Sequence, residues 1–387
     1  MSVKSSVKNI YLKDAVDLIS GRDLTKAQYN AEGKGIPYIM GASNIKDGKF
    51  IIERWTNEPT VIGKRDDIIL SVKGTVGQFF ILSEQSVHLS RQVMALRVKK
   101  GYLNGYIKYF LSFYMEKLKK KAKGMIPGIT REDILFAEIP DFELDRQESI
   151  VNTLNKITLL IDKRKAQIEA LTSLAQSLFL DNFGDPVCNT KEWTNYKLTD
   201  ICAKITDGTH DTPKRLDSGI MLITGKNIKP FKIDYSNIDY VSQDDHNIIF
   251  ARCNPEYGDI LYTNIGVNLG TALMNNINEE FSMKNVALLK LNKNIVLPRY
   301  LEFLLNYKPM KSSIIEASSS GGAQKFLSLG KIKEVSLPIP PIELQVKFSN
   351  VFEEILKQKS LLEDGLTELE SMLNSLTQKA FKGEFYI

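Results

Sequence analysis

The sequence predicts a mixed α/β (α+β) protein made of two similar globular modules and two long antiparallel helices, which form an intramolecular coiled coil with pseudo-two-fold symmetry. Three observations predict this fold. Two pairs of segments repeat about half a chain length apart, two long segments space their apolar residues by threes and fours, and both halves contain short apolar runs bounded by turn residues.

The repeated segments indicate that one structural unit occurs twice. Residues 139–144, IPDFEL, return at 339–344 as IPPIEL, and residues 171–179, LTSLAQSLF, return at 373–381 as LNSLTQKAF. Self-similarity at a fixed spacing is typical of a duplicated architecture. The repeat predicts four segments, which are module 1 (residues 1–143), a first helix (144–186), module 2 (187–343) and a second helix (344–387).

Each long helix carries a narrow apolar stripe. Its apolar residues recur every three or four positions over five turns or more, which is the pattern of a coiled-coil seam. A helix of roughly 36 residues spans about 54 Å. Because each helix lacks a partner of its own, we expect the two to pair with each other. The predicted interface residues are Ile150, Leu154, Ile157, Ile161, Ile168, Leu171 and Leu178 in the first helix and Val351, Ile355, Leu362, Leu369, Leu373 and Leu376 in the second.

Short apolar runs, two in each module, predict buried strands, because turn residues bound each run. One helix is expected to follow the second run of each module. The Gly and Pro of FGDP at 183–186 are helix-stop signals and mark the internal boundary. The strands are expected at 67–72 and 93–98 in module 1 and at 259–263 and 286–291 in module 2, with helices at 106–111 and 300–305.

Composition places the chain among ordinary globular proteins, and its charge is unevenly distributed. The chain is 43% hydrophobic and 25% charged, with a net charge of +5. Residues 1–140 carry +9 and residues 187–340 carry +2, whereas residues 141–186 and 341–387 carry −3 each. Positive modules suit a polyanion, and acidic helices suit contacts with proteins. For module 2, chance variation of the surface explains the small excess equally well.

Neither a targeting segment nor a membrane span is expected. The first eight residues, MSVKSSVK, lack the apolar stretch of a signal peptide, and no run approaches the roughly 20 apolar residues of a membrane helix. We therefore expect a cytoplasmic protein. The three cysteines, Cys188, Cys202 and Cys253, lack CxxC spacing, which favours reduced packing thiols over zinc ligands.

In both modules, two predicted strands run into polar turns that contain glycine. GIPYIMGASNI at 35–45 matches GIMLITGKNI at 219–228, and DIILSVKGTVG at 67–77 matches DILYTNIGVNLG at 259–270. Glycine permits a positive φ and a close backbone approach, while Ser, Lys, Thr and Asn offer donors to phosphates or base edges. The turns are candidate nucleic-acid contacts, although glycines that merely turn the chain would leave the same pattern.

With these motifs in place, the chain resembles a specificity subunit of a type I restriction-modification system. The resemblance is carried by the two turn motifs, by TDGTHDTPK at 206–214 and by the segments IPDFEL and IPPIEL that lead into the long helices. Together these motifs cover both halves nearly end to end, and the turns and helix leads recur in the same order. Module 1 departs from the pattern, because SGRDLT at 20–25 stands in place of GTHDTP.

The resemblance implies a DNA-binding protein that is not itself an enzyme. Each module would be a target-recognition domain for one half of a split DNA sequence. The helices would set the spacer and dock two methyltransferase (M) subunits, and through them the restriction and translocase (R) subunits. Phosphate contacts would fix the register and base-edge contacts would choose the sequence. The candidate DNA-binding residues are Lys73 and Thr75 in module 1 and Thr209, His210, Lys214, Arg215, Lys226 and Asn268 in module 2.

The sequence offers little support for catalysis by this chain. Its three histidines, His88, His210 and His246, lack metal-binding spacing, so we expect neither a catalytic residue nor a metal site. NPEY at 254–257 differs from the NPPY of amino-methyltransferases, and a GxxxxGK[ST] phosphate loop is absent from the sequence. S-adenosylmethionine and ATP are therefore expected on partner subunits only.

Two other functions remain open on the sequence alone. A coiled-coil scaffold whose modules bind proteins would keep the fold but would protect no bipartite DNA site. A self-sufficient methyltransferase or nuclease would bind S-adenosylmethionine or cleave DNA with the help of a metal.

Overall fold

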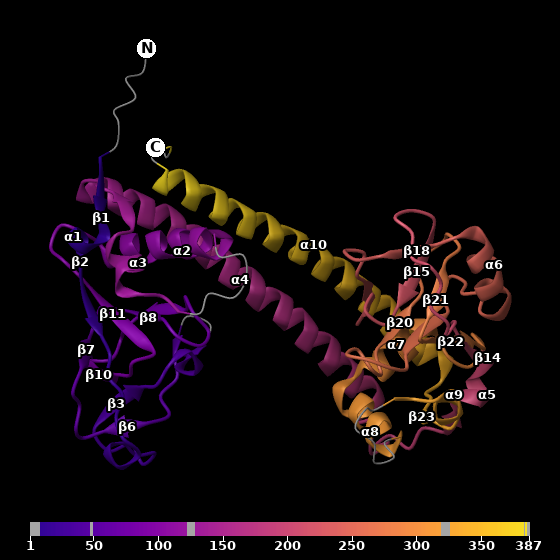
Figure 1. Cartoon of the computed structure of the whole chain (residues 1–387). Helices are drawn as coiled ribbons and strands as arrows, with labels where there is room; N and C mark the ends of the chain where they lie inside the picture. The colour runs from indigo at the N-terminus through magenta and orange to yellow at the C-terminus, as the bar shows by residue number, and fades with distance from the viewer. Residues whose placement is uncertain (1–7, 47–48, 122–127, 319–325, 383, 385–387) are drawn as a thin grey trace. The chain divides into compact units, whose positions relative to one another are not determined.

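The computed structural model describes residues 8–46, 49–121, 128–318, 326–382 and 384. Its contacts divide the chain into two units, one of residues 1–164 with 365–387 and one of residues 165–364. Each unit therefore contains one module and about half of each long helix (Figure 1). The mixed α/β class, the two modules and the pair of long helices confirm the predicted fold. Among the described residues, every helix is too short or too polar to cross a lipid bilayer.

Module 1 and the first long helix contain the following elements. They are β1 (Asn9–Tyr11), α1 (Leu12–Ala15), β2 (Val16–Ser20), β3 (Ile36–Ile39), β4 (Ile45–Lys46), β5 (Lys49–Phe50), β6 (Trp55–Thr56), β7 (Ile62–Lys64), β8 (Ile68–Ser71), β9 (Phe79–Ile81), β10 (Ser86–Leu89), β11 (Val93–Val98), α2 (Asn104–Lys121), α3 (Arg131–Leu135), β12 (Glu138–Pro140) and α4 (Leu144–Phe183), with short 3-10 turns at Lys26–Gln28 and Ala42–Asn44.

Module 2 and the second long helix repeat this order with insertions. Their elements are β13 (Asn195–Lys197), α5 (Leu198–Ile201), β14 (Cys202–Asp207), β15 (Ile220–Thr224), β16 (Ile228–Lys229), β17 (Lys232–Ile233), β18 (Asp239–Val241), α6 (Gln243–Arg252), β19 (Ile260–Thr263), β20 (Ala272–Met274), β21 (Ser282–Lys284), β22 (Val286–Leu291), α7 (Pro298–Asn306), α8 (Lys308–Ser318), α9 (Leu329–Lys333), β23 (Ser336–Pro338) and α10 (Ile342–Phe381).

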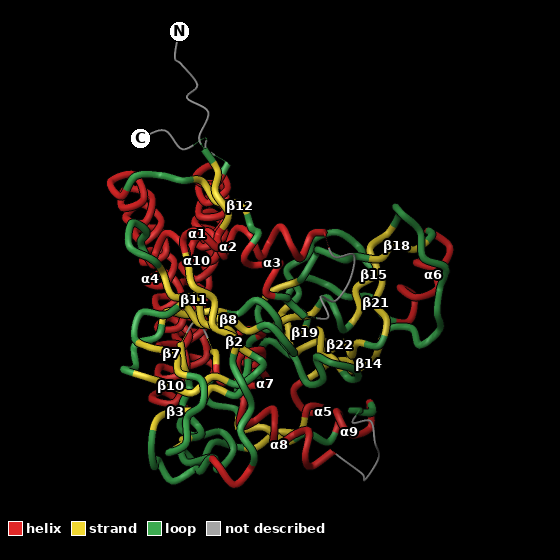
Figure 2. Tube along the Cα trace, turned by 60° about the vertical axis from the view of Figure 1, so that its left-hand side comes forward, coloured by secondary structure: helices red, strands yellow, loops and turns green. Residues whose placement is uncertain are grey.

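Each module contains two larger sheets beside two-stranded ones, and the strand orders of the larger sheets correspond except that β7 has no counterpart in module 2. Module 1 has the orders β2-β11-β8-β9 and β6-β3-β10-β7, and module 2 has β14-β22-β19-β20 and β18-β15-β21. Neighbouring strands are antiparallel except for β3 with β10 and β15 with β21. Figure 2 shows β8, β11 and β2 gathered in module 1 and β19, β22 and β14 gathered in module 2. The four predicted strands are β8, β11, β19 and β22, all of them interior strands with mostly buried residues.

A two-stranded ladder leads into each long helix and corrects the register of the sequence repeat. A buried tyrosine donates to a proline carbonyl in each copy, Tyr106 to Pro140 (2.7 Å) and Tyr300 to Pro338 (2.9 Å). The ladders β1–β12 and β13–β23 also end on these two prolines. Pro140 therefore corresponds to Pro338, and the match of IPDFEL with IPPIEL was displaced by two residues. The error arose because the structural counterpart of Ile139-Pro140 is the Leu-Pro pair at 337–338, and the Ile-Pro pair that resembles it more closely lies two residues later.

A buried glutamine joins each module to the first turn of the helix that follows it. Gln147 Nε2 donates to the carbonyls of Gly101 (3.0 Å) and Phe142 (2.7 Å), and its Oε1 accepts from the Leu103 N–H (2.9 Å). Gln345 makes the same three bonds in module 2. These bonds satisfy backbone groups that the start of the helix and the preceding loop would otherwise bury without partners.

The two long helices are continuous and antiparallel within each unit. Both α4 and α10 contain 40 residues. In unit 2, Phe179 packs against Phe348 with 5.4 Å between ring centroids, and Lys359 Nζ donates to Thr172 Oγ1 at 3.1 Å. Residue numbers thus fall along α4 as they rise along α10, which is the antiparallel direction. In unit 1, the absent side chain of Gly365 leaves room for an α4 guanidinium, which would lie 2.7 Å from a Cβ at this position.

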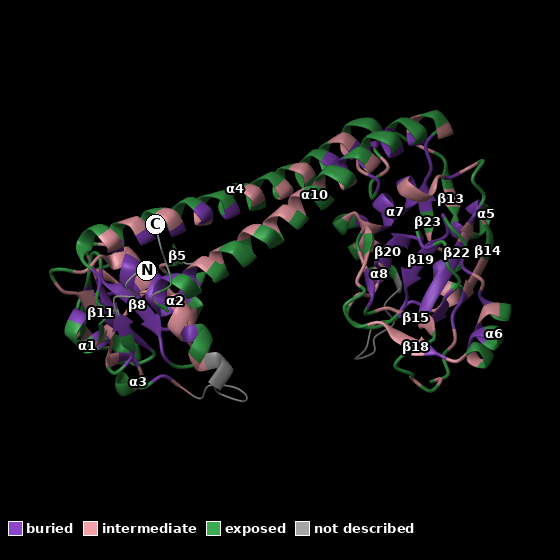
Figure 3. Cartoon of the chain, turned by 90° about the horizontal axis from the view of Figure 1, so that it is seen from above, coloured by how far each residue is buried: buried purple, intermediate pink, exposed green. Residues whose placement is uncertain are grey.

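Most of the predicted interface residues are buried or half-buried, and Figure 3 shows buried and intermediate residues along both α4 and α10. Val351 is an exception, because 48% of its side chain is exposed, and its assignment to the interface was wrong. The buried stripe of α10 instead runs through Phe348 and Phe352, one turn apart. Buried positions are Ile150, Leu154, Ile157, Ile161 and Ile355, and half-buried positions are Ile168, Leu171, Leu178, Leu362, Leu369, Leu373 and Leu376.

Module 2 contacts α10 through a group of charged side chains in which Glu302 is fully buried and Glu353 is partly exposed. Arg299 of α7 contacts Glu302 (2.6 Å) and Glu353 of α10 (2.5 Å), and Glu302 also accepts from the Met274 N–H at 2.9 Å. Burial raises the pKa of the Glu302 carboxyl, and the Arg299 guanidinium opposes that rise. In module 1, Gly105 occupies the start of α2 instead, where a Cβ would lie 2.8 Å from the Val151 side chain of α4.

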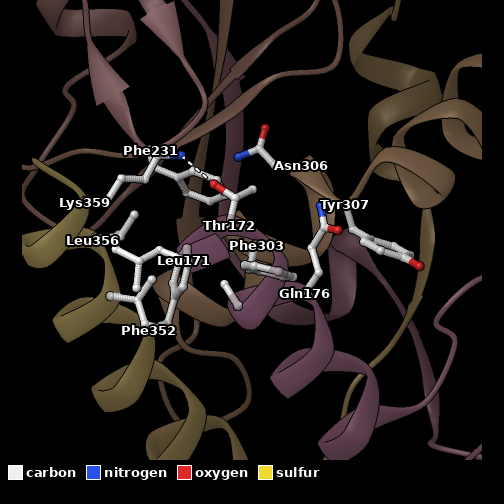
Figure 4. A pocket seen from close by; sticks show the side chains of 12 residues that line it. Leu171, Thr172, Gln176, Phe231, Phe303, Asn306, Tyr307, Phe352, Leu356 and Lys359 are labelled. Atoms are coloured by element: carbon white, nitrogen blue, oxygen red, sulfur yellow. Dashed lines mark hydrogen bonds between the residues drawn. The ribbon is translucent and has the colours of Figure 1, made fainter. Parts of the chain in front are cut away.

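An apolar pocket lies where α4 and α10 meet module 2. Figure 4 shows Phe231, from the turn between β16 and β17, together with Phe303 of α7 and Phe352 of α10. The Phe231 ring lies 5.1 Å from Phe352 and 6.1 Å from Phe303. Leu171 and other α4 residues close the remaining side. The pocket is therefore part of the seam between the helices and the module.

Phe179 is expected to be the main apolar anchor of this seam. Its ring is fully buried and stacks on Phe303 at 4.7 Å. Phe179→Ala should lower the free energy of unfolding of unit 2 by about 3–5 kcal/mol, the usual cost of deleting a buried phenylalanine. Urea denaturation of the full chain measures this change. Leu174→Ala on the exposed side of α4 is the control, and an equal effect of the two substitutions would contradict the assignment.

Candidate nucleic-acid interface

Three loops meet at one edge of the sheets in module 2, and each has a counterpart in module 1. We call them turn A (residues 40–44 and 224–227), turn B (residues 72–77 and 264–270) and loop C (residues 20–25 and 207–213). Turn A follows β3 or β15, and turn B connects β8 to β9 or β19 to β20. In module 2, loop C extends the sheet, because Thr209 bridges to Lys284 at the end of β21, the parallel neighbour of β15.

A buried hydroxyl holds turn B in both modules. Ser71 Oγ donates to the Thr75 carbonyl (2.8 Å) and accepts from the Gln78 N–H (2.9 Å). Thr263 Oγ1 likewise donates to the Asn268 carbonyl and accepts from the Thr271 N–H. The tips of the turns contain glycines with left-handed φ angles, which only glycine adopts without strain. The hydroxyl and the glycines fix the backbone while the side chains at the tip remain exposed.

A buried asparagine holds turn A in both modules. Asn44 Oδ1 accepts from the Met40 N–H (2.9 Å), and its Nδ2 donates to the Ile51 carbonyl (3.1 Å). Asn227 makes equivalent bonds with the Thr224 N–H and with a carbonyl beyond β17. Both asparagines are about 1% exposed. The asparagines of the GASNI and GKNI motifs therefore serve the fold and are not available to a ligand.

A side-chain amide connects turn A to turn B. Asn268 Nδ2 donates to the carbonyls of Gly225 (2.8 Å) and Ile228 (3.2 Å). In module 1, the Gln78 amide, oriented with its nitrogen toward the carbonyls that it faces, donates to Ala42 (3.2 Å) and Ile45 (3.1 Å). Asn268 was predicted as a DNA contact, but its amide nitrogen is directed at the backbone of the protein.

In module 2, loop C is held by the side chains around it. His210 Nε2 lies 2.7 Å from an Asp207 carboxylate oxygen, and its Nδ1 lies 3.1 Å from Asn285 Oδ1. Lys284 Nζ donates to the Asp211 carbonyl at 2.7 Å and to the Thr212 hydroxyl at 2.5 Å. Thr209 and His210 were predicted as DNA contacts, and the structure places them in this braced loop. Asp207, Lys284 and Asn285 were missed, because their role depends on neighbours distant in the sequence.

In module 1, loop C follows the same backbone path despite its different sequence. The Gly21 N–H donates to the Val93 carbonyl (3.3 Å), and the Gly208 N–H donates to the Val286 carbonyl (3.0 Å). A Cβ at Gly21 or at Gly208 would lie about 2 Å from a backbone oxygen, so both positions require glycine. SGRDLT is thus the counterpart of DGTHDT, which the sequence comparison did not reveal. Exposed Arg22 stands at the position of Thr209.

The predicted cations lie on or beside these loops. Arg215 and Lys226 share the carboxylate of Asp239, at 3.3 Å and 2.9 Å. Lys214 is exposed just after loop C. In module 1, Lys73 and Thr75 are exposed at the tip of turn B. The structure therefore brings the predicted DNA-binding residues of module 2 together near one edge of the sheets of that module. The two predicted residues of module 1 lie on turn B of module 1.

Buried carboxylates brace the strands behind turn B. Asp67 accepts two hydrogen bonds from Arg97, at 2.9 Å and 2.8 Å, and it is about 2% exposed. Asp259 and Lys290 form the equivalent pair in module 2 at 2.9 Å. Asp67 and Asp259 are the first residues of the two turn B motifs in the sequence. Because Arg97 and Lys290 are paired with these buried carboxylates, the two cations stabilise the fold and are not available to DNA.

The other chemically active side chains are dispersed. In the part of the chain that the structure describes, no group of three or more His, Cys, Asp or Glu side chains could hold a metal ion. The three cysteines are free. Cys253 is buried and Cys202 is half-buried, but Cys188 is exposed, so its assignment as a packing thiol was wrong. Burial raises the pKa of both Cys202 and Cys253 to about 12, which keeps these thiols protonated.

Comparison with known proteins identifies the family. The family described as "Type I restriction modification DNA specificity domain" matches residues 4–172 and 190–371. This chain belongs to that family. Its two matches correspond to the two halves of the repeat, and the DNA specificity subunit is therefore favoured over a plain coiled-coil scaffold. The specificity subunits of this family are generally non-catalytic.

Several relatives are specificity subunits. The putative MjaX specificity subunit of Methanocaldococcus jannaschii is 28% identical over 171 residues, which cover 42% of this chain and 39% of that protein. This match thus spans about two fifths of the relative's length. The EcoKI specificity subunit of Escherichia coli (strain K12) is 20% identical over 382 residues, which cover 89% of this chain and 82% of that one.

Two solved structures share the fold. The S subunit of a type I restriction-modification system from M. genitalium has a TM-score of 0.60 at 19% identity, and the match covers 98% of both chains. A chain from a study of complex assembly and conformational transition of the type I system has a TM-score of 0.58 at 15% identity, covering 100% of both.

In the first specificity domain, a buried histidine supports loop C. His88 Nε2 lies 2.8 Å from the Arg22 carbonyl, and its Nδ1 accepts from the N–H groups of Thr60 and Val61, both at 3.3 Å. This pattern requires a neutral ring with its proton on Nε2. Burial lowers the pKa of His88 below its ordinary value, although the Arg22 carbonyl opposes the shift.

We predict that His88 makes the stability of this domain depend on pH. Because the folded state lowers the pKa, the unfolded chain binds more protons below about pH 6.5, and stability falls as the pH decreases through the lowered pKa. The melting temperature should drop between pH 7.5 and pH 5.5, and His88→Asn should reduce this drop. Lys34→Asn, at an exposed residue before β3, is the control. An unchanged pH profile in His88→Asn would contradict the prediction.

Proposed function

We propose that this chain recognises DNA sequence in a type I restriction-modification complex, with each module reading one half of a bipartite target. One observation carries the proposal. Turn A, turn B and loop C rest on the same buried bonds in both modules, whereas the exposed residues on them differ. A constant support with variable tips is the arrangement that two readers of different sequences require.

Affinity in this proposal comes largely from phosphate contacts. Residues 1–140 carry a net charge of +9, and exposed Lys73 and Arg22 lie on turn B and loop C of module 1. Lys214, Arg215 and Lys226 are the corresponding cations of module 2. Neutralising phosphates releases counterions, which makes binding strong at low salt and weak at high salt. Base-edge contacts from side chains on the same loops then select the sequence.

The long helices set the spacing between the half-sites and dock two M subunits in this proposal. A continuous helix of 40 residues is about 60 Å long, and half-sites on one face of DNA are roughly 34–36 Å apart. The net charge of −3 on each helical segment disfavours contact with DNA and suits a protein partner. R subunits would join through the M subunits.

Catalysis belongs to the partners in this proposal. S-adenosylmethionine and ATP bind the M and R subunits, and this chain contributes neither catalytic nor metal-binding residues. Its dispersed histidines and protonated buried thiols are consistent with that role. We place the complex in the cytoplasm, with the DNA that it would read.

The test is sequence-specific footprinting with the purified M subunits. The complex should protect two short half-sites separated by an unprotected spacer, and it should methylate adenines there in the presence of S-adenosylmethionine. Binding of DNA without sequence preference would reject the proposal and favour a scaffold. Methyl transfer or cleavage by the isolated chain would favour an enzyme.

Lys73 should contribute one phosphate contact. Lys73→Ala should weaken binding to all sequences alike and flatten the slope of log K against log salt by about 0.9, the value for one phosphate. Titrations at several salt concentrations measure the slope. Lys34→Ala, at an exposed residue before β3 and outside the three loops, is the charge-matched control, and an unchanged slope in Lys73→Ala would remove Lys73 from the phosphate contacts.

Arg22 should contribute a base contact in module 1. Because an arginine recognises guanine through two parallel hydrogen bonds, Arg22→Ala should reduce discrimination by about 1–3 kcal/mol at one base pair of one half-site. Competition binding with single-mismatch duplexes measures the loss. Arg54→Ala, at a half-buried arginine outside the three loops, is the control. Equal discrimination by Arg22→Ala and the unmodified chain would contradict the assignment.

A further inference from the structure

We propose that the side-chain amides of Gln78 and Asn268 are positioning residues for DNA readout. Each amide ties turn A to turn B within its module, so that the exposed residues of both turns meet DNA as one surface. This inference rests on the proposed function and assigns a role to two residues that neither the family nor the relatives specify.

The two amides make corresponding bonds. Asn268 binds the carbonyls of Gly225 and Ile228, and Gln78 binds those of Ala42 and Ile45. Ile45 and Ile228 correspond, because each directly follows the buried asparagine of turn A. In both modules, therefore, one amide group bridges two carbonyls on opposite sides of that asparagine.

The amides reach these carbonyls from different positions in the repeat. Thr75 corresponds to Asn268, since both carbonyls accept the hydroxyl of the preceding strand, and Gln78 corresponds to Thr271, since both N–H groups donate to that hydroxyl. The two modules thus make the same bridge with side chains from non-equivalent positions of the repeat. If both modules had simply kept one side chain of a common ancestral module, the amides would stand at equivalent positions. A functional requirement for the bridge explains why it occurs in both modules.

Turn B begins with backbone pairs to neighbouring segments, Ile265 with Phe326 in module 2 and Val72 with Gln92 in module 1, but the tips beyond these pairs have little other support. Gly74 and Gly266 have φ angles of +71° and +92°, and a Cβ at either would meet no atom within 4 Å. Val267 is fully exposed, with a relative exposure of 104%. Tips in open space keep a defined position only through their bases. A bond between the base of turn B and turn A therefore controls where the tip residues lie relative to the side chains of turn A.

As a consequence, the equivalent residues Asn268 and Thr75 have different roles in the two modules. In module 2, Asn268 is committed to the bridge, and the residues that face outward are its neighbours at the tip. In module 1, Gln78 makes the bridge from the position just before β9, and Thr75 remains exposed at the tip. Misplacing a contact by about 1 Å is enough to lose most of its directional benefit, so a loosened turn should bind DNA but discriminate poorly.

The test uses the full chain in complex with its M subunits. Asn268→Leu and Gln78→Met remove the amide donors without adding charge, and Gln243→Met on the exposed side of α6 is the matched control. The probe is a library of DNA duplexes with randomised half-sites. Three quantities are measured for each variant, namely the discrimination at each half-site, the slope of log K against log salt and the melting temperature.

Asn268→Leu should reduce discrimination about tenfold at one half-site and leave the other half-site and the salt slope unchanged, because phosphate contacts persist when base contacts are misplaced. Gln78→Met should have the reciprocal effect, which provides an independent test if one variant fails to fold. Wild-type discrimination in both variants would overturn the inference. So would a parallel loss of specific and non-specific binding with a lowered melting temperature, which would assign the amides to folding alone. If the unmodified complex selects no sequence, the proposed function itself fails.

Discussion

The main constraint on this structure is that the backbone N–H and carbonyl groups of turns A and B need hydrogen-bond partners while the tips of these turns stay exposed. A turn at the edge of a sheet leaves N–H and carbonyl groups that its own strands cannot pair. In this chain, buried Ser71 and Thr263 bind turn B, and buried Asn44 and Asn227 bind turn A. Because these hydrogen-bonding side chains are buried beneath the turns, residues at the exposed tips can change without leaving buried polar groups unpaired.

The sequence was informative about elements and less so about their partners. Spacing by threes and fours predicted α4 and α10, and apolar runs predicted β8, β11, β19 and β22, because burial imposes these periods on the chain itself. Val351 was misassigned because Phe352, beside it, buries more surface. The correspondence of Gly21 with Gly208 was missed because it depends on a backbone oxygen from a distant strand, which local sequence does not encode.

The two modules use different interactions to attach to the helices, although Gln147 and Gln345 begin both helices alike. Arg299 pairs with both Glu302 and Glu353 in unit 2, and removal of Arg299 would leave the buried Glu302 carboxylate without its cation. Unit 1 replaces this group with close packing at Gly105. Ion pairs demand defined geometry, whereas close packing demands only shape. The repeated unit thus tolerates change in its attachments more readily than in its turns.

The availability of a cation for DNA depends on the burial of its partner. Arg97 pairs with Asp67, whose side chain is 3% exposed, and its transfer to a phosphate would abandon a buried carboxylate. Arg215 and Lys226 share Asp239, whose side chain is 29% exposed and can be solvated again. Exposed pairs of this kind contribute roughly 0–1 kcal/mol, which a phosphate contact with counterion release can exceed. The ion pairs of module 2 are therefore compatible with DNA binding despite its small net charge, because its paired cations can exchange one anion for another.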